Sequence, residues 1–129
     1  PYDEDLVRYG DFDPDSGYQE MKDLLSLNKI PSAVFVASDV VAIGAKAAIV
    51  EKGLRIPGDI ALVGFDDIPL ARYLDPPLTT VRLPASELAT RASQMLVQLI
   101  NNETPAEKLV LLESQLIVRQ SCGADTHID

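Results

Sequence analysis

Four polar side chains stand directly after two apolar runs of strand length, and they are the residues best suited to bind a ligand. Ser38 and Asp39 follow the run AVFVA, and Asp66 and Asp67 follow the run IALVGF. A carboxylate accepts hydrogen bonds from neighbouring hydroxyl groups, and charge-assisted bonds of this kind are stronger than neutral ones. If these side chains meet in one crevice, they suit a ligand with adjacent hydroxyl groups, such as a sugar or a nucleoside.

Other kinds of chemistry have little support in the sequence. The carboxylate pair of Asp66 and Asp67 is conceivable as a Mg²⁺ site, but the single histidine, His127, provides neither a zinc pair nor a base for a nucleophile. The lone Cys122 cannot form an internal disulfide, and its small and polar neighbours indicate an exposed end of the chain. The glycines are too dispersed for a phosphate-binding loop. We expect no metal, no cofactor and no enzymatic activity.

The elements that position the four polar residues form a strand, helix, strand unit. The apolar runs, residues 33–37 and 60–65, are typical of strands buried on both faces of a parallel sheet. Residues 40–53 between them predict a helix that is apolar nearly all round and therefore buried on more than one side. Ser38 and Asp39 can cap this helix. Because such units are parallel and right-handed, all four polar residues should emerge at the ligand-binding edge of a doubly wound sheet.

The remaining segments predict two further helices and short terminal strands. Ser16 and Gln19 have the spacing of a capping box and predict the start of a helix. Residues 86–102 predict an amphipathic helix, and LTTVRLP before it is a short extended segment that suits a crossover between lobes. The stretch VLLESQLIVRQ near the end is β-rich, with a break at Glu113 and Ser114.

Composition limits the class of protein. The 129 residues are enough for one compact α/β unit, and the chain is 47% hydrophobic and 24% charged without an apolar run long enough to span a membrane. Its 11 basic and 20 acidic residues give a formal charge of -9, the wrong sign for contacts with a phosphate backbone. We therefore expect a soluble domain that does not itself bind DNA. The opening PYDEDLVRYG lacks the features of a secretory signal, as a mature exported protein also would.

A long ordered set of motifs resembles one family. The stretch PSAVFVASDVVAIGAKAAIVEKGLRIPGDIALVGFDDIPLARYLDPPLTTV, with GDFDPDSGY before it and VRQSC after it, is similar to the C-terminal part of the effector-binding domain of lactose-repressor/galactose-repressor family regulators. The resemblance implies a periplasmic-binding-protein-like fold of type I, in which two Rossmann-like lobes, joined by three crossovers, enclose a small effector. Only part of that α/β fold is expected here.

The resemblance also implies a division of the chain. Residues 1–78 would form part of the C-terminal lobe, and residues 79–83 would be a hinge crossover. Residues 84–112 would supply a helix and a strand of the N-terminal lobe, residues 113–122 would return toward the C-terminal lobe, and residues 123–129 would be a tail.

The function implied by the resemblance is effector sensing in a cytoplasmic, homodimeric transcriptional repressor. Closure of the lobes on a sugar or other small molecule would control operator binding by a helix-turn-helix headpiece that this chain lacks. The alternative is a periplasmic sugar-binding protein of a transporter, because those proteins share the two-lobed fold. A helix-turn-helix in the parent gene would decide for the regulator, and a signal peptide there would decide for the transporter component.

The family comparison assigns roles to particular residues. Asp66 is at the position that typically reaches the effector, and Ser38 stands where sugar-sensing relatives often have asparagine. Asp39 either contacts the effector or only caps its helix, and Phe35 either stacks on an effector ring or fills the core; for both we favour the structural role. Leu83 replaces a frequent effector-binding glutamine, which leaves room for a less hydroxylated ligand.

The resemblance further implies a dimer interface on the lobe that contains the helix of residues 40–53. The candidates are Lys46, Ile49 and Val50 on that helix and Leu70 and Tyr73 in the loop after GFDD, with ordinary packing as the alternative. Because a partial domain leaves apolar faces uncovered, we expect the chain to self-associate or to belong to a larger protein.

Overall fold

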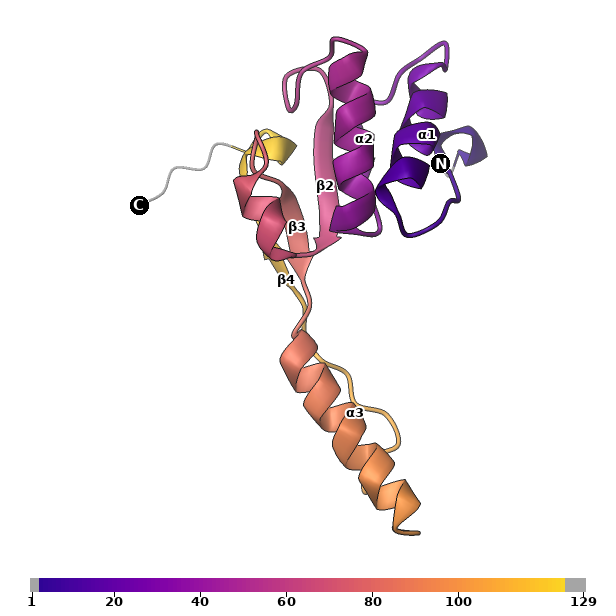
Figure 1. The fold of residues 1–129 in the computed structure, drawn as a ribbon, viewed down its shortest axis with the longest axis vertical. Coiled ribbons are helices and arrows are strands. Elements are labelled where there is room, and N and C mark those ends of the chain that lie inside the picture. Colours follow the sequence, from indigo (N-terminus) through magenta and orange to yellow (C-terminus); the bar gives the residue numbers. More distant parts are fainter. Residues whose placement is uncertain (1–2, 125–129) are drawn as a thin grey trace.

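The chain alternates helices and strands around a single sheet (Figure 1). The computed structural model describes residues 3–124. Its elements in chain order are η1 (Glu4–Leu6), α1 (Pro14–Leu25), β1 (Ala33–Phe35), α2 (Asp39–Glu51), β2 (Ala61–Asp66), η2 (Pro69–Tyr73), β3 (Thr79–Arg82), α3 (Ala85–Ile100), β4 (Gln115–Ile117) and η3 (Gln120–Cys122). The predicted α/β class and the predicted order of the main helices and strands are confirmed.

The sheet has four strands in the order β1-β2-β3-β4. β1, β2 and β3 are parallel, and β4 runs antiparallel to β3. The carboxyl ends of the three parallel strands therefore lie at one edge of the sheet, the edge that faces α3 in Figure 1. The prediction that the polar residues after the two apolar runs share one edge is confirmed.

Helix α1 begins earlier than the sequence predicted. Asp13 is its N-cap, since an Asp13 carboxylate oxygen accepts a 2.7 Å hydrogen bond from the Ser16 backbone nitrogen, and Pro14 occupies the first helical position. Aspartate caps a helix as well as serine does, and proline is preorganised for the first turn. The predicted capping box at Ser16 is therefore wrong: the Ser16 hydroxyl instead accepts a bond from the Asp11 backbone nitrogen.

Helix α2 packs on both α1 and the sheet, so the prediction that it is buried on more than one side is confirmed. The approach to α1 is so close that only glycine fits at two positions. A Cβ atom added to Gly44 would lie 1.8 Å from the Pro14 carbonyl oxygen, and one added to Gly17 would lie 2.1 Å from the Val41 carbonyl oxygen. The two glycines thus allow the backbones of α1 and α2 to touch.

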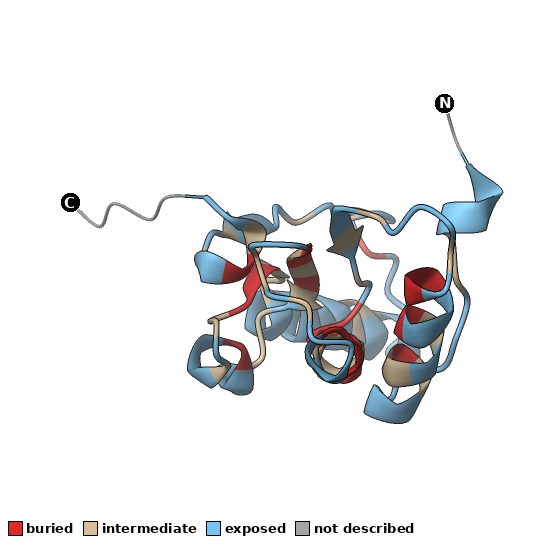
Figure 2. Cartoon of the chain, turned by 90° about the horizontal axis from the view of Figure 1, so that it is seen from above, coloured by how far each residue is buried: buried red, intermediate tan, exposed pale blue. Residues whose placement is uncertain are grey.

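The core lies on one side of the sheet, where α1 and α2 both pack (Figure 2). It is formed by Met21, Leu24, Leu25, Ala42, Ala45, Ala48, Ile49, Ile60, Leu62, Ala71 and Leu78. Residues of β1 and β2 alternate between this core and a more exposed face, on which Phe35 is 62% exposed. The prediction of strands buried on both faces is therefore wrong for this chain, because no described helix covers the second face.

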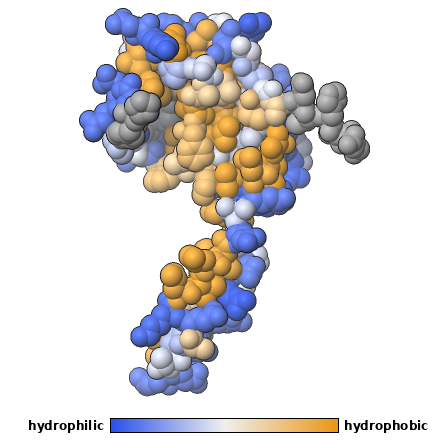
Figure 3. Space-filling view, turned by 180° about the vertical axis from the view of Figure 1, so that it is seen from behind, coloured by the Kyte–Doolittle hydropathy of each residue, from blue (hydrophilic) through white to orange (hydrophobic). Residues whose placement is uncertain are grey.

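Helix α3 extends away from the sheet (Figure 1), and none of its residues is buried. β3 leads to it and the antiparallel β4 returns beside β3, so the excursion leaves and rejoins the sheet at neighbouring strands. The large apolar side chains Leu88, Leu96 and Leu99 are all more than half exposed. Seen from behind, Figure 3 shows apolar surface both on the body that holds the sheet and along the projecting helix. Within residues 3–124, no helix is long and apolar enough to cross a membrane.

Candidate functional site

Two of the predicted site residues, Ser38 and Asp39, serve the structure at the start of α2. The Ser38 hydroxyl caps α2 by accepting a 3.3 Å hydrogen bond from the Val40 backbone nitrogen. Asp39 is completely buried: one carboxylate oxygen accepts a 2.6 Å bond from the Thr80 hydroxyl, and the other accepts a 2.9 Å bond from the Ile68 backbone nitrogen. Asp39 therefore ties α2 to β3 and to the loop after β2. Its structural role is not the predicted helix cap, which Ser38 supplies alone.

Asp66 is the carboxylate at this edge that stays open to solvent. It ends β2, is exposed, and has a φ of 112°, outside the range that side-chain-bearing residues usually adopt. Among residues 3–124, no hydrogen bond or ion pair to its carboxylate is found. Asp66 is thus free to accept hydrogen bonds from a ligand.

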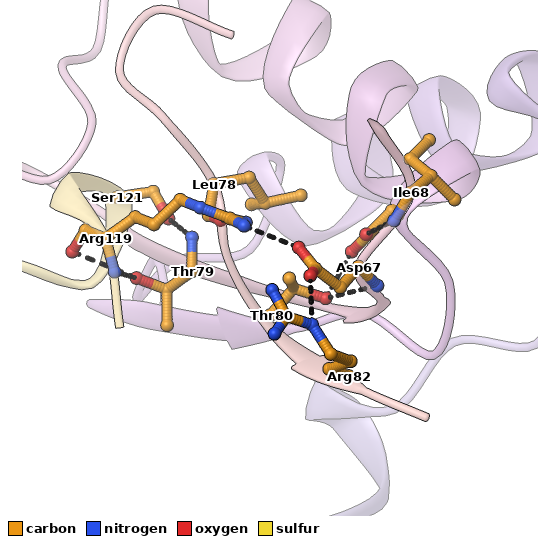
Figure 4. A network of polar contacts seen from close by, with 9 residues as sticks. Asp67, Ile68, Leu78, Thr79, Thr80, Arg82, Arg119 and Ser121 are labelled. Atoms are coloured by element: carbon orange, nitrogen blue, oxygen red, sulfur yellow. Dashed lines mark hydrogen bonds and ion pairs between the residues drawn. The ribbon is translucent and has the colours of Figure 1, made fainter. Parts of the chain in front are cut away.

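The carboxylate of Asp67, the residue directly after Asp66, is paired with two arginines (Figure 4). Its side chain is 3% exposed, and one carboxylate oxygen accepts a 2.7 Å bond from the Arg82 Nε while the other accepts a bond from Arg119 Nη2. Burial acts to raise the pKa of Asp67, but the hydrogen bonds from Arg119 and Arg82 outweigh it and hold the pKa below its ordinary value. Asp67 is therefore an ionised structural carboxylate.

Arg119 belongs to a wider network that fastens the segment after β4 to the sheet (Figure 4). Its Nη1 donates a 2.7 Å bond to the Leu78 carbonyl oxygen, and its backbone nitrogen donates to the Thr79 hydroxyl. The Ser121 hydroxyl accepts from the Thr79 backbone nitrogen and donates to the Leu62 carbonyl oxygen, at 2.8 and 2.6 Å. The sequence analysis missed these residues, although the paired hydroxyls of LTTVR and the arginine of VRQSC were visible signals.

Phe35 does not fill the core, so the favoured structural interpretation of this residue is wrong. Its ring lies on the uncovered face of the sheet, edge-to-face with Phe65 at a centroid distance of 6.4 Å. Phe35 and Ser38 both line a groove of about 610 Å³ between the segment Leu6 to Phe12 and the β1 edge. Asp66 is not among the residues that line this groove.

The predicted dimer-interface residues differ in exposure. Val50, Leu70 and Tyr73 are exposed and Lys46 is half-buried, so all four have surface to offer a partner. Ile49 is completely buried in the core against the sheet and has none. Ile49 is therefore removed from the predicted interface, because its position on α2 faces inward.

The other residues considered for metal binding or nucleophilic chemistry are not gathered into a metal site in the described part of the chain. Among residues 3–124, no group of three or more histidine, cysteine, aspartate or glutamate side chains is placed to hold a metal ion. Cys122 is partly buried, with its Sγ 3.5 Å from the Arg119 carbonyl oxygen. His127 lies outside the described residues.

Comparison with known proteins identifies the family to which this fold belongs. Residues 2–122 match the periplasmic binding protein-like domain. The HTH-type transcriptional repressor PurR of Pasteurella multocida (strain Pm70) is 40% identical over 117 residues, which are 91% of this chain and 35% of the relative. The probable HTH-type transcriptional repressor ExuR of Bacillus subtilis (strain 168) is 45% identical over 113 residues, 87% of this chain and 34% of the relative. The chain spans about a third of the length of these curated relatives.

Solved structures agree with the sequence relatives. The structure described as a complex of the transcriptional regulator CelR with cellobiose has a TM-score of 0.88 and 40% identity, over 94% of this chain and 37% of that one. A regulatory protein of the LacI family from Chloroflexus aggregans has a TM-score of 0.83 and 37% identity, over 95% of this chain and 44% of that one. The predicted fold class and family resemblance are confirmed. The chain belongs to the periplasmic binding protein-like domain family, in the form carried by LacI-family transcriptional regulators.

Proposed function

We propose that this chain supplies part of the effector-binding crevice of a transcriptional repressor, with Asp66 as its main contact. The observation that carries the proposal is the contrast between three neighbouring carboxylates. The side chains of Asp39 and Asp67 are buried and already bonded within the protein, whereas Asp66 is exposed at the carboxyl edge of the sheet, where doubly wound sheets bind ligands.

The ligand class follows from the chemistry of a free carboxylate. Asp66 can accept two hydrogen bonds from adjacent hydroxyl groups, which suits a sugar or a nucleoside-like molecule. The cellobiose complex of a relative with the same fold supports a hydroxylated ligand. Ser38 and Phe35 are secondary candidates in this proposal, because the Ser38 hydroxyl already caps α2 and the Phe35 ring offers only stacking contacts. Leu83, which has no polar side chain, limits the number of polar contacts.

The proposed mechanism is conformational and involves no catalysis. Residues 79–83 would be a hinge crossover, residues 84–112 part of the other lobe and residues 113–122 the return. Closure of the two lobes on the effector would change operator binding by a separate headpiece in a cytoplasmic homodimer. With a charge of -9, this segment is itself unsuited to hold DNA. The names of its relatives, which are repressors, favour this function over sugar delivery to a transporter.

The test measures ligand binding by the protein at its natural length, expressed from its own gene. Isothermal titration with a panel of mono- and disaccharides, including cellobiose, and of nucleosides should identify a ligand. Asp66→Gly removes the carboxylate and tolerates the positive φ, and it should weaken that ligand roughly tenfold or more.

The control is Asp23→Gly, a change of the same kind at an exposed position of α1. It should alter stability but leave the dissociation constant unchanged. A ligand bound equally well by the Asp66 variant contradicts the site, and a natural-length protein that binds the ligand but no operator DNA contradicts the regulatory function.

A further inference from the structure

We propose that Asp67 is a positioning residue. With Arg82 and Arg119 it forms a clasp that holds Asp66 at the crevice. The clasp also fixes β3 and β4, the strands that lead to and return from α3, to β2. The clasp is defined as the side chains of these three residues. The inference rests on the proposed function of Asp66, but the clasp itself can be tested without a ligand.

The clasp joins three segments that are far apart in the sequence (Figure 4). Asp67 follows β2, Arg82 is the last residue of β3, and Arg119 follows β4. Arg82 Nε lies 2.7 Å from one Asp67 oxygen, and Arg119 bonds the other oxygen while also donating to the Leu78 carbonyl. One carboxylate therefore links the strand that leads toward α3 and the strand that returns from it.

Burial makes the clasp more than a surface ion pair. The Asp67 side chain is 3% exposed and that of Arg119 is 14% exposed, while Arg82 is about half exposed. Exposed ion pairs contribute little to stability, but a buried carboxylate that loses its partners remains as an uncompensated charge. The Asp67–Arg119 pair should therefore persist in every state that keeps this sheet edge folded. Arg82 is the more accessible of the two arginines that bind Asp67.

The backbone conformation of Asp66 and Asp67 requires contacts that stabilise it. Asp66 and Asp67 both have positive φ, 112° and 55°, which is costly for residues other than glycine. The surrounding contacts must hold this conformation: the Asp67 backbone nitrogen lies 3.4 Å from the Thr80 hydroxyl, and the Ile68 backbone nitrogen donates to the buried Asp39. The clasp adds the side-chain restraint, so the direction of the Asp66 carboxylate depends on Asp67.

A second consequence concerns movement. β3 and β4 are the described connections between the sheet and α3. Asp67 binds Arg82 at the end of β3 that leads to α3, and it also binds the side chain of Arg119, which follows β4 at that strand's other end. Any rotation of the α3 side must therefore bend the chain beyond Arg82 and before Gln115, where the pairing of β3 and β4 ends. The clasp sets the sheet-side boundary of the hinge and keeps Asp66 fixed while the other side moves.

The test compares Asp67→Asn with wild type in the ligand-free protein at its natural length, by hydrogen exchange. Asparagine has the same shape but lacks the charge that draws both arginines, so the backbone amides of residues 66–68 should exchange about tenfold faster. The amides of α2, which lie in the core, should keep their protection. If a panel compound binds, its affinity for the variant should fall about fivefold or more.

Asp59→Asn is the matched control. Asp59 pairs with Arg55 through two side-chain bonds of 2.9 and 3.1 Å, but it lies before β2, away from the crevice. This variant should leave exchange at residues 66–68 unchanged.

Two outcomes would overturn the clasp: unchanged exchange at residues 66–68 in Asp67→Asn, or an equal loss of protection in α2, which would mean a role in global folding. If Asp67→Asn does not fold, Arg82→Gln removes only the half-exposed arm and should give a smaller acceleration at the same amides. Failure of every panel compound to bind the wild type would contradict the proposed function, whereas the exchange result decides the clasp separately.

Discussion

Four aspartates of this chain have different roles because their burial and their bonding partners differ. Asp39 is buried and bonded to uncharged groups, Asp67 is buried between two arginines, Asp59 is paired at the surface, and Asp66 is open to solvent. The amino-acid type alone does not distinguish these roles. The surroundings leave Asp66 as the member of this set that can bind a ligand without breaking a contact within the protein.

Asp39 should be the most costly of the four to remove. Asp39→Ala would leave the Thr80 hydroxyl and the Ile68 backbone nitrogen without their partner in a buried site, and we expect the free energy of unfolding to fall by roughly 2–4 kcal/mol. Denaturant unfolding measures the change. Asp23→Ala, exposed on α1, should change it by less than about 0.5 kcal/mol, and an equally mild effect at Asp39 would contradict the structural role.

The pH dependence of the clasp has a definite sign. The folded-state pKa of Asp67 is lowered, so its stabilising contribution is complete above the unfolded-state value of about 4 and is lost as pH falls through the folded value. The difference in unfolding free energy between wild type and Asp67→Asn should therefore be constant from about pH 7 to pH 5 and shrink below about pH 4. Denaturant unfolding across this range measures it. A difference that grows on acidification would be the wrong sign.

The exposed ion pair of Arg55 and Asp59 should be detectable through the pKa of Asp59. The side-chain and backbone hydrogen bonds from Arg55 lower the pKa of Asp59 to about 2. Carboxyl carbon shifts followed by NMR should give Asp59 a midpoint near this value in the wild type. Arg55→Gln should move the midpoint up toward the ordinary value for aspartate, and an unmoved midpoint would show that the pair is not formed in solution.

At the scale of elements, the contact between α1 and α2 depends on two glycines. Gly17 and Gly44 leave no room for a Cβ atom. In both cases the nearest obstructing atom belongs to the backbone of the opposite helix, which cannot turn away as a side chain can. This contact holds the N-terminus of α2, and with it Ser38 and Asp39, against the edge of the sheet.

Gly44→Ala should therefore be destabilising although alanine has the higher helix propensity. The added Cβ would meet the Pro14 carbonyl oxygen and force the helices apart, at a cost of about 1–3 kcal/mol or more. Gly58→Ala is the control, because its nearest neighbour is the Arg55 side chain at 3.4 Å. Thermal unfolding measures both variants, and a stabilised Gly44→Ala would show that the helices are not in close contact.

Most of this level of structure could be predicted from the sequence. The apolar runs and the intervening helix predicted the parallel strands and the shared edge, because a strand, helix, strand unit permits one arrangement. The position of Asp66 followed from that. The roles of Asp67 and Ile49 did not, since they depend on which side chains meet across 52 residues in one case and on which side of α2 faces the sheet in the other.

At the scale of the whole molecule, large apolar side chains are exposed both on one face of the sheet and along α3. Figure 3 shows apolar surface on the body that holds the sheet and along α3. Phe35 on the sheet is exposed, and none of the α3 leucines is buried. Exposed apolar area of this kind marks a surface that another part of a protein covers. The division of the chain into two lobes stays a prediction.

The 129-residue chain by itself should therefore self-associate. In sedimentation velocity we expect species larger than the 14.0 kDa monomer, because association buries the apolar side of α3. Replacing Leu88, Leu96 and Leu99 together by glutamine should shift the distribution toward monomer. Replacing Arg91 and Gln94 by alanine, on the predicted polar side, should not, and a wild-type chain that stays monomeric would contradict the expectation.

The adjacency of β3 and β4 makes the excursion through α3 a separable module. Arg82 and Gln115 are direct partners at the point where the chain departs and returns, so the two strands already have the arrangement of a hairpin. A two-residue turn such as Asn-Gly in place of residues 83–114 would close it with the twist that paired strands prefer. In engineering terms, the sheet half is a compact scaffold that carries Asp66 and its supports, onto which a different second half can be grafted.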